Sequence, residues 1–352
     1  MRVLVAMSGG VDSSVAAALL KEAGHDVVGA TLKLWGGASD SGCCSVSDVD
    51  DARRVAHSLD IDHHIFNYTS EFEAAVVKPF VEDHAAGLTP NPCIECNRAI
   101  KFDLLFERAE RLGFDAVATG HHALVESWNG RPTLTRSIDP LKDQSYVLGY
   151  IQGPILQRLL LPIGGMNKEE VRVHAERLNL RTWNKPDSQD VCFIEASRGR
   201  EAFLGERIEL TSAEVFDRVT QEVVGRVPAA QLVTLGQRRG IAPGFDGERR
   251  FVASVDLENR RVEVDRIEAI MVSSLALRPD SLTFAYEAVP HGTRVSVQWS
   301  AHGRPVSATL DTGDMPRLIL DEPARPVSAG QSVVLYDAES GRHVLGAAQV
   351  GR

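Results

Sequence analysis

The sequence predicts an α/β protein with a doubly wound parallel sheet, followed by a small β-rich domain and a C-terminal β-barrel. Strand-like and helix-like patterns alternate over about the first 190 residues, which indicates successive βα units. From about residue 205 the pattern changes to short alternating runs separated by turn residues, which is typical of all-β structure. A chain of 352 residues is long enough for two or three domains. We therefore expect domains at residues 1–204, 205–270 and 271–352.

The elements of the α/β region follow from local signals. Residues 2–7 form a continuous apolar run, as expected of a buried parallel strand. Residues 13–24 are rich in alanine and leucine and end at Gly24, which predicts a helix with a glycine stop. Asn167 with Glu170 three positions later is the capping-box pattern of a helix start. By the same reasoning we expect strands at 26–35, 62–68 and 114–122 and helices at 46–60 and 100–113.

The second half of the chain reads as β-structure throughout. Alternating apolar and polar residues predict strands at 207–211, 250–256, 260–265, 294–300, 306–311 and 332–337. The neighbourhood of Met271 is the expected break between a central module and a barrel of about 80 residues.

The composition excludes some classes of protein. No run of 18 or more apolar residues occurs, so a membrane span is not expected. The N-terminal segment reads as a first strand without a cleavage site, and five cysteines without a secretion signal indicate a reducing, cytoplasmic setting. The net charge of -10 disfavours indiscriminate binding to polyanions but is compatible with a local basic groove.

The most specific motif is "SGGVDSS" (residues 8–14), which joins the first strand to the first helix. Its glycines let backbone N–H groups approach an anion, and the helix N-terminus adds partial positive charge. Asp12 is unexpected beside phosphate unless Mg²⁺ bridges the two. The segment matches neither the Walker loop nor the dinucleotide fingerprint. It has the pattern of the pyrophosphate loop of N-type ATP pyrophosphatases, which cleave ATP to AMP and pyrophosphate.

Four further segments concentrate polar or reactive side chains. "ATGHH" (118–122) ends a predicted strand. The alternative to a functional role is that its histidines are surface or capping residues, and we favour this interpretation for His122. "KDQSYVL" (142–148) combines a cation, a carboxylate, an amide and an aromatic ring. "DSQDVCFIE" (187–195) places Cys192 in a strand-like apolar end, where core packing is the alternative role. "TLGQRRGI" (234–241) is a basic turn.

Together with "TPNPCIECNRAIKF" (89–102) and "GCCS" (42–45), these segments resemble the MnmA family of tRNA-specific 2-thiouridylases. The matching segments span most of the first 240 residues, and the β-rich remainder matches in length and texture only. The resemblance implies an adenylating α/β domain, a small central domain and a barrel that helps to hold tRNA. It implies replacement of the C2 oxygen of the wobble uridine by sulfur in tRNAs for Lys, Glu and Gln.

The resemblance also implies roles for individual residues, with ATP and Mg²⁺ as cofactors. The expected ATP site comprises Ala6, Met7, Ser8, Gly9, Gly10, Val11, Asp12, Ser13, Leu32 and Gly120. The expected contacts to the target base and the tRNA are Asn91, Pro92, Cys93, His121, Lys142, Asp143, Gln144 and Gln331.

For sulfur transfer, the resemblance implies that Cys192 carries the persulfide and that Cys96 is the nucleophile. The reaction would end in a Cys96–Cys192 disulfide. A nucleophilic thiol benefits from nearby cations or a helix N-terminus. Arg98 and Lys101 are close in sequence, and a helix is expected to begin just after Cys96. The sulfur donor implied is a cysteine desulfurase or a sulfur carrier. The flipped-out base requires a pocket.

The sequence departs from the family pattern at two positions. Cys93 replaces an expected aspartate, and Val233 replaces an expected aromatic residue. The resulting C-x-x-C leaves two alternatives to a bare persulfide: a [4Fe–4S] cluster on Cys93, Cys96 and Cys192, or a zinc site. Cys43 and Cys44 are adjacent and read as a packed loop or a secondary sulfur path.

Two other functions compete with thiolation. Another pyrophosphate-loop ligase or amidotransferase would need an ammonia source and no paired thiols. A nucleotide-binding stress protein with a zinc clip would leave "KDQSYVL" and the β-rich half without a role. We expect a monomer with no membrane partner.

Overall fold

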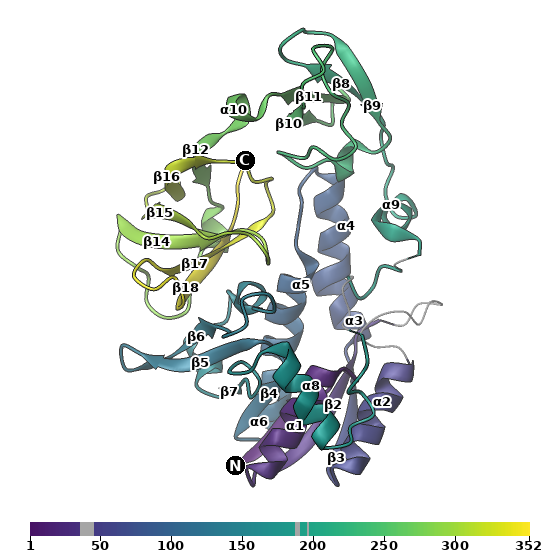
Figure 1. The fold of residues 1–352 in the computed structure, drawn as a ribbon, viewed down its shortest axis with the longest axis vertical. Coiled ribbons are helices and arrows are strands. Elements are labelled where there is room, and N and C mark those ends of the chain that lie inside the picture. The colour runs from purple at the N-terminus through teal and green to yellow at the C-terminus, as the bar shows by residue number, and fades with distance from the viewer. Residues whose placement is uncertain (36–45, 187–190, 196) are drawn as a thin grey trace.

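The computed structural model describes residues 1–35, 46–186, 191–195 and 197–352. Figure 1 shows the α/β region with the N-terminus at one end of the long axis and the small central sheet at the other. The C-terminal barrel lies between these two ends, next to the hairpin formed by β5 (Ala123–Trp128) and β6 (Arg131–Arg136). The predicted fold class is confirmed.

The α/β region is built on a parallel sheet of five strands in the order β3–β2–β1–β4–β7. These strands are β1 (Arg2–Ala6), β2 (Asp26–Lys33), β3 (Asp62–Asn67), β4 (Ala116–Thr119) and β7 (Leu159–Leu160). Alternate residues of β1 enter different cores: Val3 and Val5 lie in one hydrophobic cluster and Leu4 in another. Because helices cover both faces, the central strands are apolar throughout.

The helices around this sheet include α1 (Val11–Glu22), α2 (Val46–Ser58), α3 (Thr69–Phe72), α4 (Lys78–Ala85), α7 (Gly153–Leu156), α8 (Lys168–Arg177) and α9 (Gly199–Gly205). Of these, α1, α2 and α8 lie close to their predicted positions, whereas α3, α4, α7 and α9 were not predicted. A π-helical segment, η1 (Glu73–Val77), joins α3 to α4. Gly24 has φ +81° just after α1, and Asn167 and Glu170 form the predicted capping box.

The cysteine-bearing helix starts earlier than predicted. It begins with α5 (Pro92–Glu95), continues through the π-helical segment η2 (Cys96–Leu104) and ends with α6 (Leu105–Arg111). The expectation of a helix that starts after Cys96 was wrong because Asn91 caps the helix: its side chain accepts a hydrogen bond from the Cys93 N–H at 3.1 Å. Pro92 follows at the first helical position, where its missing N–H costs nothing.

The central region is a four-stranded sheet in the order β10–β11–β8–β9. Its strands are β8 (Ala213–Asp217), β9 (Val223–Val227), β10 (Phe251–Asp256) and β11 (Arg261–Asp265). The predicted strand at 207–211 is absent, since these described residues follow α9 without pairing. The short helix α10 (Ile267–Ile270) leads into the barrel.

The C-terminal sheet has seven strands in the order β12–β16–β15–β14–β17–β18–β13. Its strands are β12 (Val272–Ala276), β13 (Thr283–Phe284), β14 (Thr293–Gln298), β15 (Val306–Asp311), β16 (Arg317–Ala324), β17 (Ser332–Asp337) and β18 (Val344–Gln349). A bridge between Leu277 and Val350 joins its two sides into a barrel. We keep 204/205 and 270/271 as proposed domain boundaries. None of the described helices is both long and apolar enough to cross a membrane.

Candidate functional site

The phosphate loop lies between β1 and α1, at the carboxyl edge of the sheet. Gly9 has φ +73°, and a Cβ at this position would lie 2.2 Å from the Asp48 carbonyl oxygen, so only glycine fits. Ser13 shapes the loop from inside, because its Oγ accepts a hydrogen bond from the Ser8 N–H at 3.1 Å. The loop thus forms the kind of anion-binding site that backbone N–H groups and the N-terminus of α1 provide together.

Gly120, at the exit of β4, packs directly against this loop. A Cβ on Gly120 would lie 2.5 Å from the backbone nitrogen of Ser13 and 2.6 Å from the carbonyl carbon of Asp12. Only glycine therefore allows the exit of β4 to pack this closely against residues 12 and 13. This requirement comes in addition to the predicted role of Gly120 beside a nucleotide.

A cavity of about 500 Å³ opens in front of the loop. Most predicted ATP-site residues line it, as do residues from the cysteine-bearing helix and from the barrel. Its wall includes Ala6, Met7, Ser8, Gly10, Val11, Asp12, Ser13, Leu32, Lys101, Gly120, His121, His122, Lys142, Asp143, Gln144, Lys168, Lys185, Ala301 and His302.

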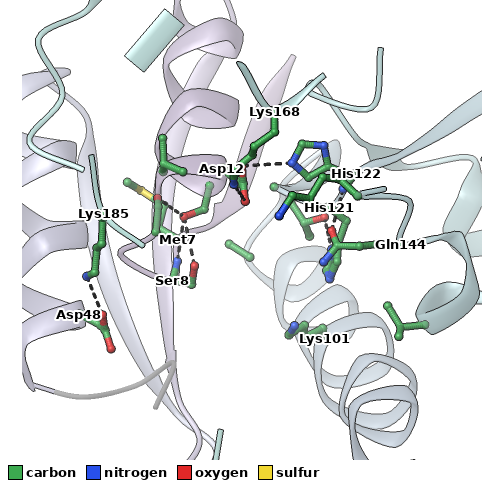
Figure 2. A pocket seen from close by; sticks show the side chains of 18 of the residues that line it. Met7, Ser8, Asp12, Asp48, Lys101, His121, His122, Gln144, Lys168 and Lys185 are labelled. Atoms are coloured by element: carbon green, nitrogen blue, oxygen red, sulfur yellow. Dashed lines mark hydrogen bonds and ion pairs between the residues drawn. The ribbon is translucent and has the colours of Figure 1, made fainter. Parts of the chain in front are cut away.

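Asp12 is held by two cationic or polar partners on one side of this cavity. The Nζ of Lys168 lies 2.8 Å from both carboxylate oxygens, and the Nε2 of His122 lies 3.2 Å from Oδ1 (Figure 2). Burial alone would raise the pKa of Asp12, but the His122 hydrogen bond and the Lys168 charge together lower it. Asp12 is therefore a carboxylate, and its charge is balanced by protein groups.

This arrangement changes the expected role of Asp12. Both of its oxygens are occupied by Lys168, so as arranged the carboxylate does not fit the direct Mg²⁺ ligation that the sequence suggested. The protein places its own ammonium where the motif alone seemed to require a metal.

A second cation lies on the opposite side of the cavity. The Nζ of Lys185 lies 2.7 Å from an oxygen of Asp48 (Figure 2). It also lies 2.7 Å from an oxygen of Asp51 and 3.0 Å from the Gly9 carbonyl oxygen. Burial lowers the pKa of Lys185, but the two carboxylates outweigh that effect and raise it. Lys185 ties the phosphate loop to α2.

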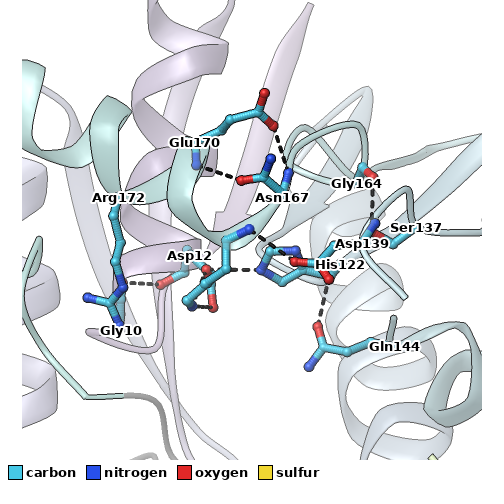
Figure 3. A network of polar contacts seen from close by, with 12 residues as sticks. Gly10, Asp12, His122, Ser137, Asp139, Gln144, Gly164, Asn167, Glu170 and Arg172 are labelled. Atoms are coloured by element: carbon cyan, nitrogen blue, oxygen red, sulfur yellow. Dashed lines mark hydrogen bonds and ion pairs between the residues drawn. The ribbon is translucent and has the colours of Figure 1, made fainter. Parts of the chain in front are cut away.

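The two histidines of "ATGHH" are buried rather than on the surface. His122 is 2% exposed, which shows that the surface interpretation was wrong. Its backbone N–H donates to Gln144 Oε1 at 2.8 Å, and Figure 3 shows the contacts that run from Asp12 through His122 to Gln144. The Nδ1 of His121 lies 2.7 Å from Thr119 Oγ1. Burial, with the charge of Lys101, holds the pKa of His121 well below its usual range.

Cys93 and Cys96 occupy different environments within the first turns of their helix. Cys93 is exposed and Cys96 is buried. Arg98 pairs with Glu95 at 2.7 Å, so its charge is partly balanced there, whereas Lys101 lines the cavity. The helix N-terminus favours a thiolate most strongly in the first turn, where Cys93 lies.

Cys192 is half-buried and packs against the hydrophobic cluster that contains Cys96. Residues 191–195 form a turn rather than the predicted strand end, because Phe193 anchors them by packing against Phe72, Phe80 and Phe203. Cys43 and Cys44 lie outside the described residues.

The structure does not gather a metal site from the cysteines. Over the described chain, which includes all three cysteines of the cluster hypothesis, no three His, Cys, Asp or Glu side chains are placed to hold a metal ion. A [4Fe–4S] cluster or a zinc ion on Cys93, Cys96 and Cys192 stays a prediction, which metal analysis tests.

The predicted tRNA contacts divide into two groups. Lys142, Asp143 and Gln144 all line the cavity, but the carboxylate of Asp143 is hydrogen-bonded within the protein. Gln331 lies beside Gly330, where an added Cβ would be 3.1 Å from the backbone nitrogen of Thr89. The Thr89 N–H also donates to the Ala329 carbonyl at 2.9 Å. The barrel loop at 329–331 thus lies against the segment that leads into the cysteine-bearing helix.

Sequence reasoning missed several contributors to the cavity, including three basic side chains. Lys168 and Lys185 were not considered as site residues, and neither was His302, in the loop between β14 and β15. For Lys168 a signal was available, since the capping box places it in the first turn of a helix at the carboxyl edge of the sheet. Nothing local in sequence distinguishes His302.

Comparison with known proteins agrees with this geometry. The family described as tRNA methyl transferase HUP domain matches residues 1–196, and the family described as aminomethyltransferase beta-barrel domain matches residues 275–350. The tRNA-specific 2-thiouridylase MnmA of Salinispora tropica is 44% identical over 361 residues, covering 99% of each chain. That of Mycobacteroides abscessus is 42% identical over 364 residues, covering 100% of each.

Among solved structures, the U34-tRNA thiolase NcsA from Methanococcus maripaludis with its [4Fe–4S] cluster aligns with a TM-score of 0.37 and 20% identity. The alignment covers 54% of this chain and 61% of that one, and the likeness carries no functional inference. The full-length relatives and the match to the first 196 residues show the family. The chain belongs to the MnmA family of tRNA-specific 2-thiouridylases.

Proposed function

We propose that the protein catalyses ATP-dependent 2-thiolation of the wobble uridine in tRNAs for Lys, Glu and Gln. The observation that carries the proposal is the shared cavity: the phosphate loop, Lys101 of the cysteine-bearing helix and His302 of the barrel all line it. One ligand assembly can therefore contact the nucleotide site, the helix that carries the thiols and the barrel at once. Membership of the MnmA family supports the same reaction.

The first step is adenylation of the target base. The uracil C2 oxygen attacks the α-phosphorus of ATP, the α–β phosphoanhydride bond breaks, and pyrophosphate leaves. The loop N–H groups and α1 stabilise the developing phosphate charge, and Lys168 and Lys185 supply cations at the cavity wall. The base must leave the anticodon stack to reach this site.

The second step transfers sulfur to C2. Cys192 carries a persulfide whose terminal sulfur comes from a cysteine desulfurase or a sulfur carrier. In one route the Cys96 thiolate attacks the Cys192 sulfur, forming a disulfide and releasing hydrosulfide, which displaces AMP from C2. In the other route the persulfide displaces AMP first, and Cys96 then frees the thiocarbonyl by forming the same disulfide. A cellular dithiol must reduce that disulfide before the next turnover.

Incubation with ATP, Mg²⁺, a persulfide-loaded donor and tRNA tests the proposal. We expect 2-thiouridine at the wobble position by mass spectrometry, with equimolar AMP, and no thiolation of a transcript with cytidine there. AMP release driven by ammonia and a small acid, without thiolation, would instead favour the ligase alternative. We further propose that the protein acts as a cytoplasmic monomer, which sedimentation with and without tRNA tests.

A further inference from the structure

Asp143 lies in "KDQSYVL", and its carboxylate is saturated by protein donors. Oδ1 accepts hydrogen bonds from the Ser137 N–H at 2.9 Å and the Ser145 N–H at 3.2 Å. Oδ2 accepts from Arg136 Nη1 at 3.0 Å and from Ser145 Oγ at 2.7 Å. The Asp143 side chain is 6% exposed. Four donors occupy the usual lone-pair directions of a carboxylate, so little capacity is left for an external ligand.

The same cluster reaches into the barrel. The hydroxyl of Tyr336, on β17, lies 3.0 Å from Ser145 Oγ, and its ring lies 3.7 Å from the Arg136 guanidinium carbon. Arg136 Nε also donates to the Gly341 carbonyl oxygen at 2.8 Å, in the turn after β17. Tyr336 is fully buried. Charge-assisted hydrogen bonds gain strength in such a dry interior.

A second set of contacts follows the same interface. Arg136 lies at the end of the hairpin β5 (Ala123–Trp128) and β6 (Arg131–Arg136), and its backbone N–H donates to the Arg342 carbonyl at 3.0 Å. The Trp128 ring stacks on His343 at 4.7 Å. Hairpin and barrel thus form a continuous interface that includes the cluster.

The position of the barrel determines the shape of the cavity, because Ala301 and His302 line it from the barrel side. We propose that Asp143 is a positioning residue: with Arg136, Ser145 and Tyr336 it forms a lock, here called the Asp143 lock, that holds the barrel on the catalytic region. Asp143 acts through this lock rather than by touching RNA. The proposal rests on the proposed function in one respect, because it assumes that the RNA is tRNA.

Hydrogen exchange of the RNA-free protein tests the lock without any activity. Asp143→Asn should raise exchange at residues 337–343 of the barrel, and Tyr336→Phe should raise it at 131–137 of the hairpin. Each change thus has its reporter on the opposite side of the interface. Tyr68→Phe is the matched control, since its hydroxyl lies 3.5 Å from the Leu104 carbonyl, away from the barrel. Exchange that rises only on the mutated side, or not at all, would overturn the lock.

Binding of tRNA gives a second, independent test. We expect each variant to weaken tRNA affinity roughly tenfold, as for loss of one buried hydrogen bond. The double variant should be no weaker than the worse single variant, because both residues act through one network. If the fold-losses in tRNA affinity of the two single variants multiply in the double variant, Asp143 contacts the RNA directly and the proposal is wrong. Circular dichroism checks folding, and Ser145→Ala is the milder substitute if Asp143→Asn unfolds. Absence of thiolation with intact cross-interface exchange effects would sink the proposed function and leave the lock standing.

Discussion

The ammonium of Lys168 lies 2.8 Å from both carboxylate oxygens of Asp12, although the two residues are 156 positions apart. An acidic side chain in a phosphate loop would by itself repel ATP. Lys168 offsets that effect, because it places a balancing cation at the cavity wall. The pair explains why the loop tolerates Asp12.

We expect Lys168→Met to weaken ATP binding roughly 10- to 100-fold, since a charge-assisted contact contributes about 1.5–3 kcal/mol. Isothermal titration with ATP measures the effect, and Lys168→Arg should retain part of the affinity. Lys21→Met is the matched control, because Lys21 lies in the last turn of α1, away from the loop, and its Nζ donates to the Asp60 carbonyl oxygen. Wild-type affinity in Lys168→Met would remove Lys168 from the phosphate site.

Single substitutions of the cysteines test the role of each thiol. Cys96→Ser and Cys192→Ser should each abolish thiolation and leave ATP and tRNA affinities within about twofold, because serine keeps the shape but cannot carry or attack a persulfide. Mass spectrometry of the tRNA gives the readout. Cys93→Asp should stay active if Cys93 stands in for a carboxylate.

The iron–sulfur alternative makes the opposite prediction. A cluster would bring about four iron atoms per chain in anaerobically purified protein and would be lost in Cys93→Asp. Full activity of Cys192→Ser with free sulfide under those conditions would contradict the persulfide role. Iron analysis should be run on the wild type and the three variants together.

The pH dependence of stability should include a contribution from His121. Its pKa in the fold lies well below the ordinary value of about 6.5, so the unfolded state binds the proton more readily. Stability is therefore complete above pH 6.5 and falls as the pH drops toward the folded pKa, by up to about 1.4 kcal/mol per unit. Urea unfolding of His121→Gln between pH 7 and 5 should show a shallower loss. Exposed His57→Gln is the control and should follow the wild type.

The central region has its own buried ion pair. Arg250 Nε donates to Asp217 Oδ2 at 2.9 Å, and both side chains are fully buried. Arg250→Met leaves an unpaired buried carboxylate, so we expect a loss on the order of 3 kcal/mol in the free energy of unfolding. Denaturant titration measures it. Arg294→Met, which breaks an exposed pair with Asp321, should change little, and equal losses would refute the argument.

Local signals in the sequence sufficed for much of the fold. The Gly24 stop, the Asn167–Glu170 capping box and strands such as β17 and β15 were predicted because each depends on a few neighbouring residues. The expected helix start after Cys96 failed for a local reason, since the capping role of Asn91 was not recognised. The strand expected around Cys192 failed because aromatic packing from distant helices overrides its apolar pattern.

The sequence by itself determined the family pattern and the phosphate loop, and it suggested which thiols react, since these features reside in contiguous motifs. Only the tertiary structure decided what those motifs touch. The sheet order brings the ends of β1 and β4 together, and with them Asp12, His122 and the start of α8. Burial then made His122 a partner of Asp12, and it made Asp143 a partner of Arg136 and Ser145, which contact the barrel. Ion pairs and buried hydrogen bonds between distant segments depend on packing, which no local pattern encodes.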